Sequence, residues 1–333
     1  MQNALALLKE TILETIPEPS HSKVLFLNGL YDTELSGHFD ITLWQPFKPY
    51  AEHAERLLED LNGDETLYPY VFLLCPKNVT ESQYLIAQAF TRLNENGVLY
   101  LCAENAVNGK RLDKWIENTG LSFDAYKAHK SRCLVIQKTS SLNASLISEW
   151  LETGHIQENI DGFQTQAGLF CWNKIDRGSA LLIETINEKL KGKGADFGCG
   201  YGYLTKSVLP DHPKIKHMDV FDADNRALTC STLNIPDPEK ITPHWVDLSK
   251  PYKHPRPFDF IVMNPPFHEG KKQDHSIGQS FIINAKHNLV SRGGILWMVA
   301  NATLPYETVL KEHFFQVDLI ARKDGFKVLR ALT

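Results

Sequence analysis

The chain has 333 residues, of which 43% are hydrophobic and 23% are charged, and its formal net charge at pH 7 is −5. This composition is typical of a globular protein and excludes disordered, collagen-like and coiled-coil chains. No apolar run approaches the roughly 20 residues that a membrane helix needs, and the length favours two domains.

The N-terminal segment predicts an amphipathic helix, because Lys9, Glu10 and Glu14 interrupt its apolar residues. It has neither the basic region nor the small-residue cleavage site of a signal peptide. The six cysteines are scattered without a C-x-x-C pair. This spacing is typical of a reduced protein and argues against a zinc ribbon or a disulfide framework. We therefore expect a cytoplasmic protein without a metal.

In the first half, apolar runs predict strands at Val24–Leu27, Val71–Leu74 and Val98–Ala103. The connecting region that follows is rich in Ser, Asn, Gln and Gly and includes a predicted helix at Leu142–Leu151. A domain boundary after that helix is typical of such a region. It divides the chain into domains at 1–160 and 161–333.

The second half alternates strictly between predicted strands and helices. The strands are expected at Ala195–Gly198, His217–Phe221, Ile241–Val246, Phe258–Met263, Ile295–Val299, Phe315–Ala321 and Phe326–Leu332. The helices are expected at Tyr203–Leu209, Arg226–Leu233, Ser280–Val290 and Tyr306–Glu312. This order predicts a doubly wound, mostly parallel α/β sheet of seven strands. The last two strands are too close in sequence for a parallel crossover, so they should form an antiparallel hairpin.

The first half resembles a weakened copy of the second. Residues 96–103 align with 293–300, and the strand at Val71–Leu74 aligns with the one that ends at Met263. A repeat of this length predicts duplication of a whole domain, although two unrelated α/β domains could share such strand patterns. Where the second copy has Asn-Pro-Pro-Phe the first has Cys75–Asn78. The first copy is therefore expected to lack an active site.

A glycine-rich turn follows the strand at Ala195 and carries Gly198, Gly200 and Gly202, with Asp196 two residues ahead of the first glycine. Glycines at a strand-to-helix turn let the backbone approach a ligand closely. A dinucleotide fingerprint would need its third glycine at the position of Tyr203, so the spacing argues against a nicotinamide cofactor. A tight turn without a ligand is the alternative.

Two more carboxylates follow the next strands. Asp222 lies at the tip of the second strand, where a carboxylate can accept hydrogen bonds from both ribose hydroxyls. Asp224 is the better candidate for a helix N-cap. Asp247 follows the third strand and could accept an adenine amino group, but an ordinary loop carboxylate fits equally well.

Asn264-Pro265-Pro266-Phe267 follows the fourth strand. The prolines fix φ, and the Asn264 side chain and the Pro265 main chain each offer a carbonyl oxygen. Two acceptors held in this way can bind both hydrogens of an exocyclic amine and aim its lone pair at an electrophile. Phe267 could stack on the planar group that carries the amine. A proline-rich turn is the alternative.

Together these residues resemble class I S-adenosylmethionine-dependent methyltransferases with a Rossmann-like fold, in the branch that methylates amines. The match continues through His268-Glu269-Gly270 and includes Ile175–Ser179 ahead of the glycine turn. With the duplicated layout, the chain is similar to the RsmC-type small-subunit ribosomal RNA guanine-N2 methyltransferases. The resemblance covers the whole chain and is strongest over residues 165–333.

The resemblance implies S-adenosylmethionine as the cofactor, bound by Asp176, Gly178, Ser179, Asp196, Gly198, Gly200, Asp222 and Asp247. It implies that the catalytic residues are Asn264, Pro265, Pro266 and Phe267. Substrate contacts are expected from His268, Lys271 and Lys272. The implied fold is two tandem methyltransferase domains, of which only 161–333 is catalytic. The implied partner is 16S ribosomal RNA or the small ribosomal subunit, with the guanine flipped out of its stack, and we expect a monomer.

Charge divides unevenly along the chain. Residues 1–165 contain 13 basic and 22 acidic side chains, whereas 166–333 contain 22 basic and 18 acidic ones. RNA is therefore expected to contact the second half, where Arg322, Lys323, Lys327 and Arg330 form a candidate patch. The related large-subunit (23S) guanine-N2 enzymes and a non-catalytic ribosome assembly factor remain alternatives. DNA adenine-N6 and protein glutamine-N5 enzymes usually have Tyr in place of Phe267.

Overall fold

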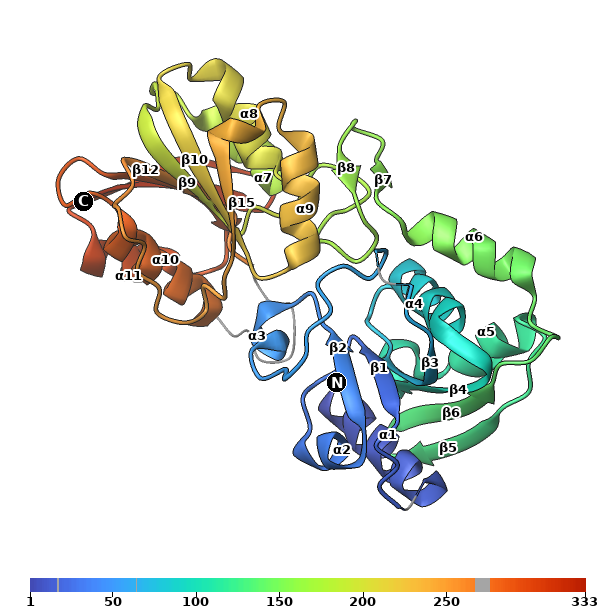
Figure 1. The fold of residues 1–333 in the computed structure, drawn as a ribbon. Helices are drawn as coiled ribbons and strands as arrows, with labels where there is room; N and C mark the ends of the chain where they lie inside the picture. The colour runs from blue at the N-terminus through green and yellow to red at the C-terminus, as the bar shows by residue number, and fades with distance from the viewer. Residues whose placement is uncertain (17, 64, 267–275) are drawn as a thin grey trace. The chain divides into compact units, whose positions relative to one another are not determined.

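The computed structural model describes residues 1–16, 18–63, 65–266 and 276–333. Within them the chain divides into two compact units, Met1–His155 and Ile156–Thr333 (Figure 1). The division follows directly on the helix α6 (Ala144–Gly154), slightly before residue 160. Each unit has its own sheet and its own hydrophobic clusters. Four predicted site residues lie outside the described residues, namely Phe267, His268, Lys271 and Lys272.

The second unit contains a seven-stranded sheet in the order β11-β10-β9-β12-β13-β15-β14. Its strands are β9 (Gly192–Phe197), β10 (Ile215–Asp222), β11 (Ile241–Trp245), β12 (Phe260–Met263), β13 (Ile295–Asn301), β14 (Gln316–Lys323) and β15 (Phe326–Leu332). The pairs from β11 to β13 are parallel, whereas β15 pairs antiparallel with both β13 and β14. The predicted doubly wound sheet with a terminal hairpin is confirmed.

Helices cover both faces of this sheet. They are α7 (Arg177–Thr185), α8 (Tyr203–Asp211), α9 (Asn225–Asn234), α10 (Ser276–Asn288) and α11 (Tyr306–His313). Because successive strand residues point to opposite faces, Ile261 and Met263 pack in the cluster with α10 and α11, whereas Phe260 and Val262 pack in the cluster with α7 to α9. The central strand β12 is therefore buried on both faces, which explains its continuous apolar sequence.

Several element boundaries differ from the sequence-based expectation, and two helices illustrate this. The helix α7 was not expected, although Asp176 caps its N-terminus by accepting a hydrogen bond from the Ser179 N–H. The helix α8 continues past Leu209 through Pro210 to Asp211. A proline in the last turn removes one hydrogen bond near the helix end, where the loss matters least.

The first unit repeats this layout with one strand fewer. Its sheet order is β2-β1-β3-β4-β6-β5, with β1 (Lys23–Leu27), β2 (Asp40–Trp44), β3 (Tyr68–Leu74), β4 (Leu93–Glu104), β5 (Asp124–Ala128) and β6 (Ser131–Gln137). Its helices are α1 (Gln2–Thr15), α2 (Thr33–His38), α3 (Lys48–Ala51), α4 (Val79–Arg92) and α5 (Leu112–Asn118), besides α6 and a π-helical turn at Asn105–Gly109. At the place of β11, the described residues of this unit form a bridge between Leu43 and Leu57. The matching strand order confirms the tandem architecture.

The second unit begins with a short hairpin of β7 (Gln157–Glu158) and β8 (Gln164–Thr165). All six cysteines have free thiols. Among the described residues, no helix has the length and apolar character to cross a membrane.

Candidate active site

The site lies where the direction of strand addition reverses. The chain runs from β9 outward to β10 and β11 and then crosses to β12 on the other side of β9. Phe197 at the end of β9 pairs in register with Met263 at the end of β12. The glycine turn and Asn264 therefore emerge side by side from adjacent strands. Open α/β sheets bind their ligands at such a point.

The three glycines of the turn all adopt positive φ, with values of 77° at Gly198, 53° at Gly200 and 90° at Gly202. Only glycine adopts this region without strain. A Cβ added at Gly200 would meet nothing within 4 Å, so this position faces open space. At Gly202 it would lie 2.7 Å from Ser231 Oγ, so this glycine is required by packing.

Asp196 is fully buried at the base of the turn. Its Oδ2 accepts a hydrogen bond of 2.7 Å from Thr205 Oγ1, while its Oδ1 has no partner. Burial raises the pKa of this carboxyl to about 7, although the hydrogen bond from Thr205 opposes the shift. An unpaired buried carboxylate oxygen is costly, so Oδ1 is suited to a polar ligand group.

Asp222 connects the tip of β10 to the glycine turn. Its Oδ2 accepts from the Gly200 N–H and its Oδ1 from the Asp224 N–H, both at 2.9 Å. Burial raises the pKa of Asp222 to about 6, against the effect of these hydrogen bonds. Asp224 caps α9 by accepting from the Arg226 N–H, as expected. Each oxygen of Asp222 still has a second lone pair for a hydroxyl.

Asn264 contacts residues far away in the sequence. Its Nδ2 donates to Asp176 Oδ2 at 3.0 Å and to Ser179 Oγ at 2.9 Å. The structure thus brings the beginning of α7 to the end of β12. Pro265, which follows, is buried and Pro266 is exposed.

Gly178 and Asp247, which were expected to bind the cofactor, make contacts within the fold. A Cβ at Gly178 would lie 2.8 Å from the Phe326 ring, so packing against β15 explains this glycine. Asp247 is nearly buried, and its Oδ1 accepts from the Ser249 N–H at 2.9 Å and from Ser249 Oγ. These contacts shape the loop after β11, and Asp247 Oδ2 lies 3.9 Å from the Nζ of Lys250.

A cavity connects these elements. Its lining combines five predicted site residues with six that the sequence patterns missed: Asp176, Ser179, Gly198, Gly200 and Asn264, and then Phe170, Cys171, Cys199, Tyr201, Tyr203 and Leu204. Phe170 is 58% exposed, which is unusual for a large apolar side chain. The signal that could have revealed it is a lone aromatic residue in a polar connecting segment.

The predicted basic patch on the terminal hairpin is only partly available. Lys327 is buried, and its Nζ lies 2.6 Å from both carboxylate oxygens of Glu307. Arg330 donates to both carboxylate oxygens of Glu188. These two cations are neutralised within the fold, so only Arg322 and Lys323 remain exposed for RNA.

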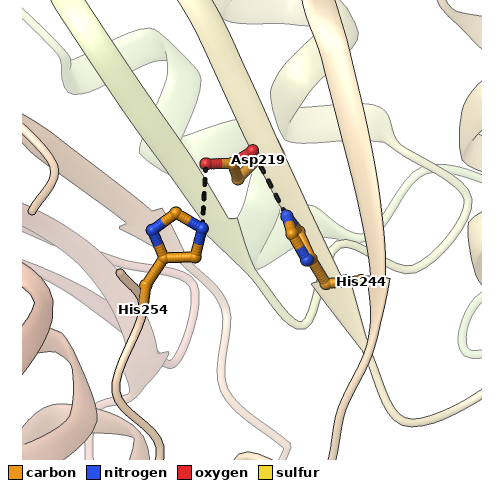
Figure 2. Close-up of side chains that lie close together, drawn as sticks. All are labelled: Asp219, His244 and His254. Atoms are coloured by element: carbon orange, nitrogen blue, oxygen red, sulfur yellow. Dashed lines mark hydrogen bonds and ion pairs between the residues drawn. The ribbon is translucent and has the colours of Figure 1, made fainter. Parts of the chain in front are cut away.

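A separate polar cluster lies beneath the loop before β12. Figure 2 shows Asp219 between His244 and His254, at 3.2 and 3.8 Å from their Nε2 atoms. The ligand atoms lie within 4.8 Å of one another, close enough for a metal ion. Lys193 Nζ, however, lies 2.5 Å from Asp219 Oδ2 and already neutralises the carboxylate. We therefore assign these side chains to an internal charge network.

Comparison with known proteins identifies the family of this chain. The Methyltransferase small domain model matches residues 161–330. The "Ribosomal RNA small subunit methyltransferase C" of Alteromonas mediterranea is 30% identical over 269 residues, which cover 78% of this chain and 72% of that protein. The protein of the same name from Psychromonas ingrahamii is 28% identical over 93% of this chain and 88% of its own length.

A solved structure also matches almost the whole fold. It is the 16S rRNA N2 G1207 methyltransferase of T. thermophilus in complex with AdoMet and guanosine. The TM-score is 0.80 at 21% identity, over 99% of this chain and 91% of that one. The likeness extends over both units and establishes the tandem fold.

Proposed function

The chain belongs to the family of the small-subunit ribosomal RNA methyltransferases C, and from that membership we propose that it methylates the exocyclic N2 amine of a guanine in 16S ribosomal RNA. It is an S-adenosylmethionine-dependent ribosomal RNA methyltransferase. The position that the T. thermophilus enzyme modifies, guanine 1207, is the proposed target. The observation that carries the proposal is the placement of Asn264 beside the glycine turn.

The residues around the glycine turn fit S-adenosylmethionine. Asp196 Oδ1 is buried without a partner, the space beside Gly200 is open, and Asp222 has free lone pairs for ribose hydroxyls. Asp247 Oδ2 would accept the adenine amine. When bound, the cofactor supplies a methyl group on a positively charged sulfur.

The chain's own contribution to catalysis is orientation. Asn264 Oδ1 and the main-chain carbonyl of Pro265 would accept hydrogen bonds from the guanine amine and point its lone pair toward the methyl group. Pro266 stiffens the segment, and Phe267 would stack on the base after it leaves its helix. The amine loses its proton readily once methylated, so no dedicated base is assigned. His268, Lys271 and Lys272 are proposed contacts to the RNA.

We assign the first unit, with its boundary near residue 160, a supporting role without a cofactor. The corresponding sheet edge is closed by its own amide side chains. Asn28 donates to the Leu74 carbonyl at 2.7 Å, Gln45 to the Gly29 carbonyl at 2.8 Å, and Asn108 to the Pro76 carbonyl at 2.8 Å. These contacts occupy the edge that, in the second unit, carries the glycine turn and Asn264.

The test is methyl transfer to small ribosomal subunits and to stripped 16S RNA, with the modified nucleoside mapped by mass spectrometry. We expect N2-methylguanosine with the wild type and at least a 100-fold lower rate with Asn264→Ala, because an amine acceptor is lost. Binding of S-adenosylmethionine, measured by calorimetry, should change little in this variant. Asn3→Ala, an exposed asparagine of the first unit, is the control.

Three results would contradict the proposal. Methylation of large-subunit RNA alone would favour the 23S alternative. Failure of the wild type to bind S-adenosylmethionine would favour an assembly factor. Undiminished transfer by Asn264→Ala would remove the assigned mechanism.

A further inference from the structure

The side-chain amide of Asn264 can present two chemically different faces. One end is a carbonyl acceptor and the other is an NH₂ group with two donors, and rotation by about 180° exchanges them. Only the carbonyl end can accept a hydrogen bond from a substrate amine. The contacts made by the other end therefore decide whether Asn264 can bind its substrate.

Two acceptors hold the NH₂ end. Asp176 Oδ2 lies 3.0 Å from Asn264 Nδ2 and Ser179 Oγ lies 2.9 Å from it, so each amide hydrogen has an acceptor. A carboxylate accepts only. A rotated amide would place Asn264 Oδ1 against Asp176 Oδ2, and two acceptors would face each other.

The carboxylate is itself held in place. Asp176 is the N-cap of the nine-residue helix α7, and its Oδ2 also accepts a hydrogen bond of 2.8 Å from the Ser179 N–H. A helix N-terminus favours a negative charge, so this position suits the Asp176 carboxylate as a hydrogen-bond acceptor. Ser179 is also 7% exposed, so water competes little for these hydrogen bonds.

We propose that Asp176 and Ser179 are positioning residues that lock Asn264 with its carbonyl oxygen toward the substrate. This role differs from the cofactor contact that the family resemblance implies for them. The inference rests on the proposed function and sharpens it, because a locked acceptor selects substrates that present an amine and repels those that present a carbonyl. The N-cap of α7 thereby decides that Asn264 presents an acceptor, and not a donor, to the substrate.

Substitution of the carboxylate by an amide tests the lock. In Asp176→Asn the amide has a single oxygen in place of the Oδ2 that both caps α7 and accepts from Asn264. When its NH₂ group turns toward Asn264 Oδ1 instead, the rotated state is permitted. We expect kcat to fall on the order of 10- to 100-fold. KM for the RNA and Kd for S-adenosylmethionine should stay within about twofold.

Ser179 offers a graded version of the same test. Ser179→Ala removes one of the two acceptors and should lower kcat by about 3- to 10-fold, whereas Ser179→Thr keeps a hydroxyl and should restore most of the rate. Asn143→Ala is the matched control, because Asn143 caps α6 in the same way and contacts no site residue. It should leave kcat unchanged.

A second readout does not depend on activity. In ¹⁵N-labelled protein the NH₂ signal of Asn264, identified by its loss in Asn264→Ala, should show two hydrogens protected from solvent exchange. Protection should disappear in Asp176→Asn. If the wild type transfers no methyl to ribosomal RNA, the proposed function fails while this signal still decides the lock. Unprotected hydrogens in the wild type, or a weakened Kd for S-adenosylmethionine with unchanged kcat in Asp176→Asn, would overturn the inference.

Discussion

At the scale of single residues, the site is built around two carboxyl groups whose pKa values are raised toward neutral pH by burial. Asp196 and Asp222 lie under the glycine turn, and burial raises their pKa values to about 7 and about 6. Their hydrogen bonds come from Thr205 and from backbone N–H groups, and none of these described donors is a cation. A ligand that brings hydrogen-bond donors would offset this cost.

Asp196 predicts an unusual pH dependence of stability. Its pKa is raised from 3.8 to about 7 in the folded state, so the folded protein binds more protons and its free energy of unfolding falls as pH rises from about 4 to 7. Asp196→Asn should remove most of this slope and raise the stability at pH 8 by on the order of 4 kcal/mol. Urea unfolding without cofactor at pH 5 and pH 8 measures both. The exposed Asp211→Asn should keep the wild-type slope, and an unchanged slope in Asp196→Asn would contradict this account.

At the scale of elements, the glycine turn performs two separable tasks. Gly202 is the N-cap of α8, and its missing side chain lets the turn approach Ser231 on α9. Gly200 faces open space instead. Packing therefore explains one glycine, and access for a ligand explains the other.

Alanine at each glycine should separate these tasks. Gly202→Ala combines positive φ with a clash and should lower the free energy of unfolding by about 2–4 kcal/mol. Gly200→Ala meets no atom and should cost about 1 kcal/mol, but it should weaken S-adenosylmethionine binding at least tenfold by occupying the open space. Thermal unfolding and calorimetric titration of the same two variants measure both effects. Equal losses of affinity and stability in the two variants would refute the separation.

The network of Asp219 joins neighbouring strands on the sheet. Lys193 lies on β9, Asp219 on β10 and His244 on β11. Burial pushes the pKa of Asp219 upward, but the hydrogen bond from His244 and the charge of Lys193 outweigh it, and the net pKa lies below its usual value. The stability that Asp219 contributes is therefore present above pH 4 and lost as pH falls further, opposite to Asp196.

Breaking this network from one side should be costly. Lys193→Met leaves a buried carboxylate without its cation and should destabilise the protein by about 2–3 kcal/mol at pH 7. Lys193→Met combined with Asp219→Asn should cost less than the two single changes together. Urea unfolding of the three variants measures this coupling. A melting temperature of the wild type that drops on addition of EDTA would show instead that a metal occupies the cluster.

At the scale of the whole molecule, one architecture occurs twice, and the two copies differ in strand number and in charge. Both units order their strands alike, but among the described residues the counterpart of β11 in the first unit is a bridge and not a strand. The acidic side chains are in excess in residues 1–165, and the basic ones in 166–333. The copy that carries the glycine turn therefore also carries the basic excess, which favours contact with an anionic partner.

This division predicts how the isolated halves behave. Residues 156–333 have their own hydrophobic clusters and should fold alone and bind S-adenosylmethionine within about tenfold of the full chain. Residues 1–155 should fold but show no binding. Circular dichroism and calorimetry on the two fragments check this. Cofactor binding by the first fragment would contradict its supporting role.

The sequence by itself determined the tandem α/β fold, the terminal hairpin and the location of the glycine turn and Asn264. These follow from local rules, since residue periodicity, positive φ at glycine and the stiffness of proline act over a few neighbouring positions. The helix α7 is the exception. The sequence indicates the motif Ile175–Ser179 but no helix there, although Asp176 is a typical N-cap residue.

Only the tertiary structure decided which distant side chains form hydrogen bonds and ion pairs with one another. It joined Asn264 to Asp176 and Ser179, more than 80 positions earlier, and it paired Arg330 with Glu188, which removed that cation from the expected RNA patch. No local pattern encodes such contacts, because packing of the helices against the sheet decides which distant donors and acceptors meet. The polarity of the Asn264 amide is therefore a property of the folded chain.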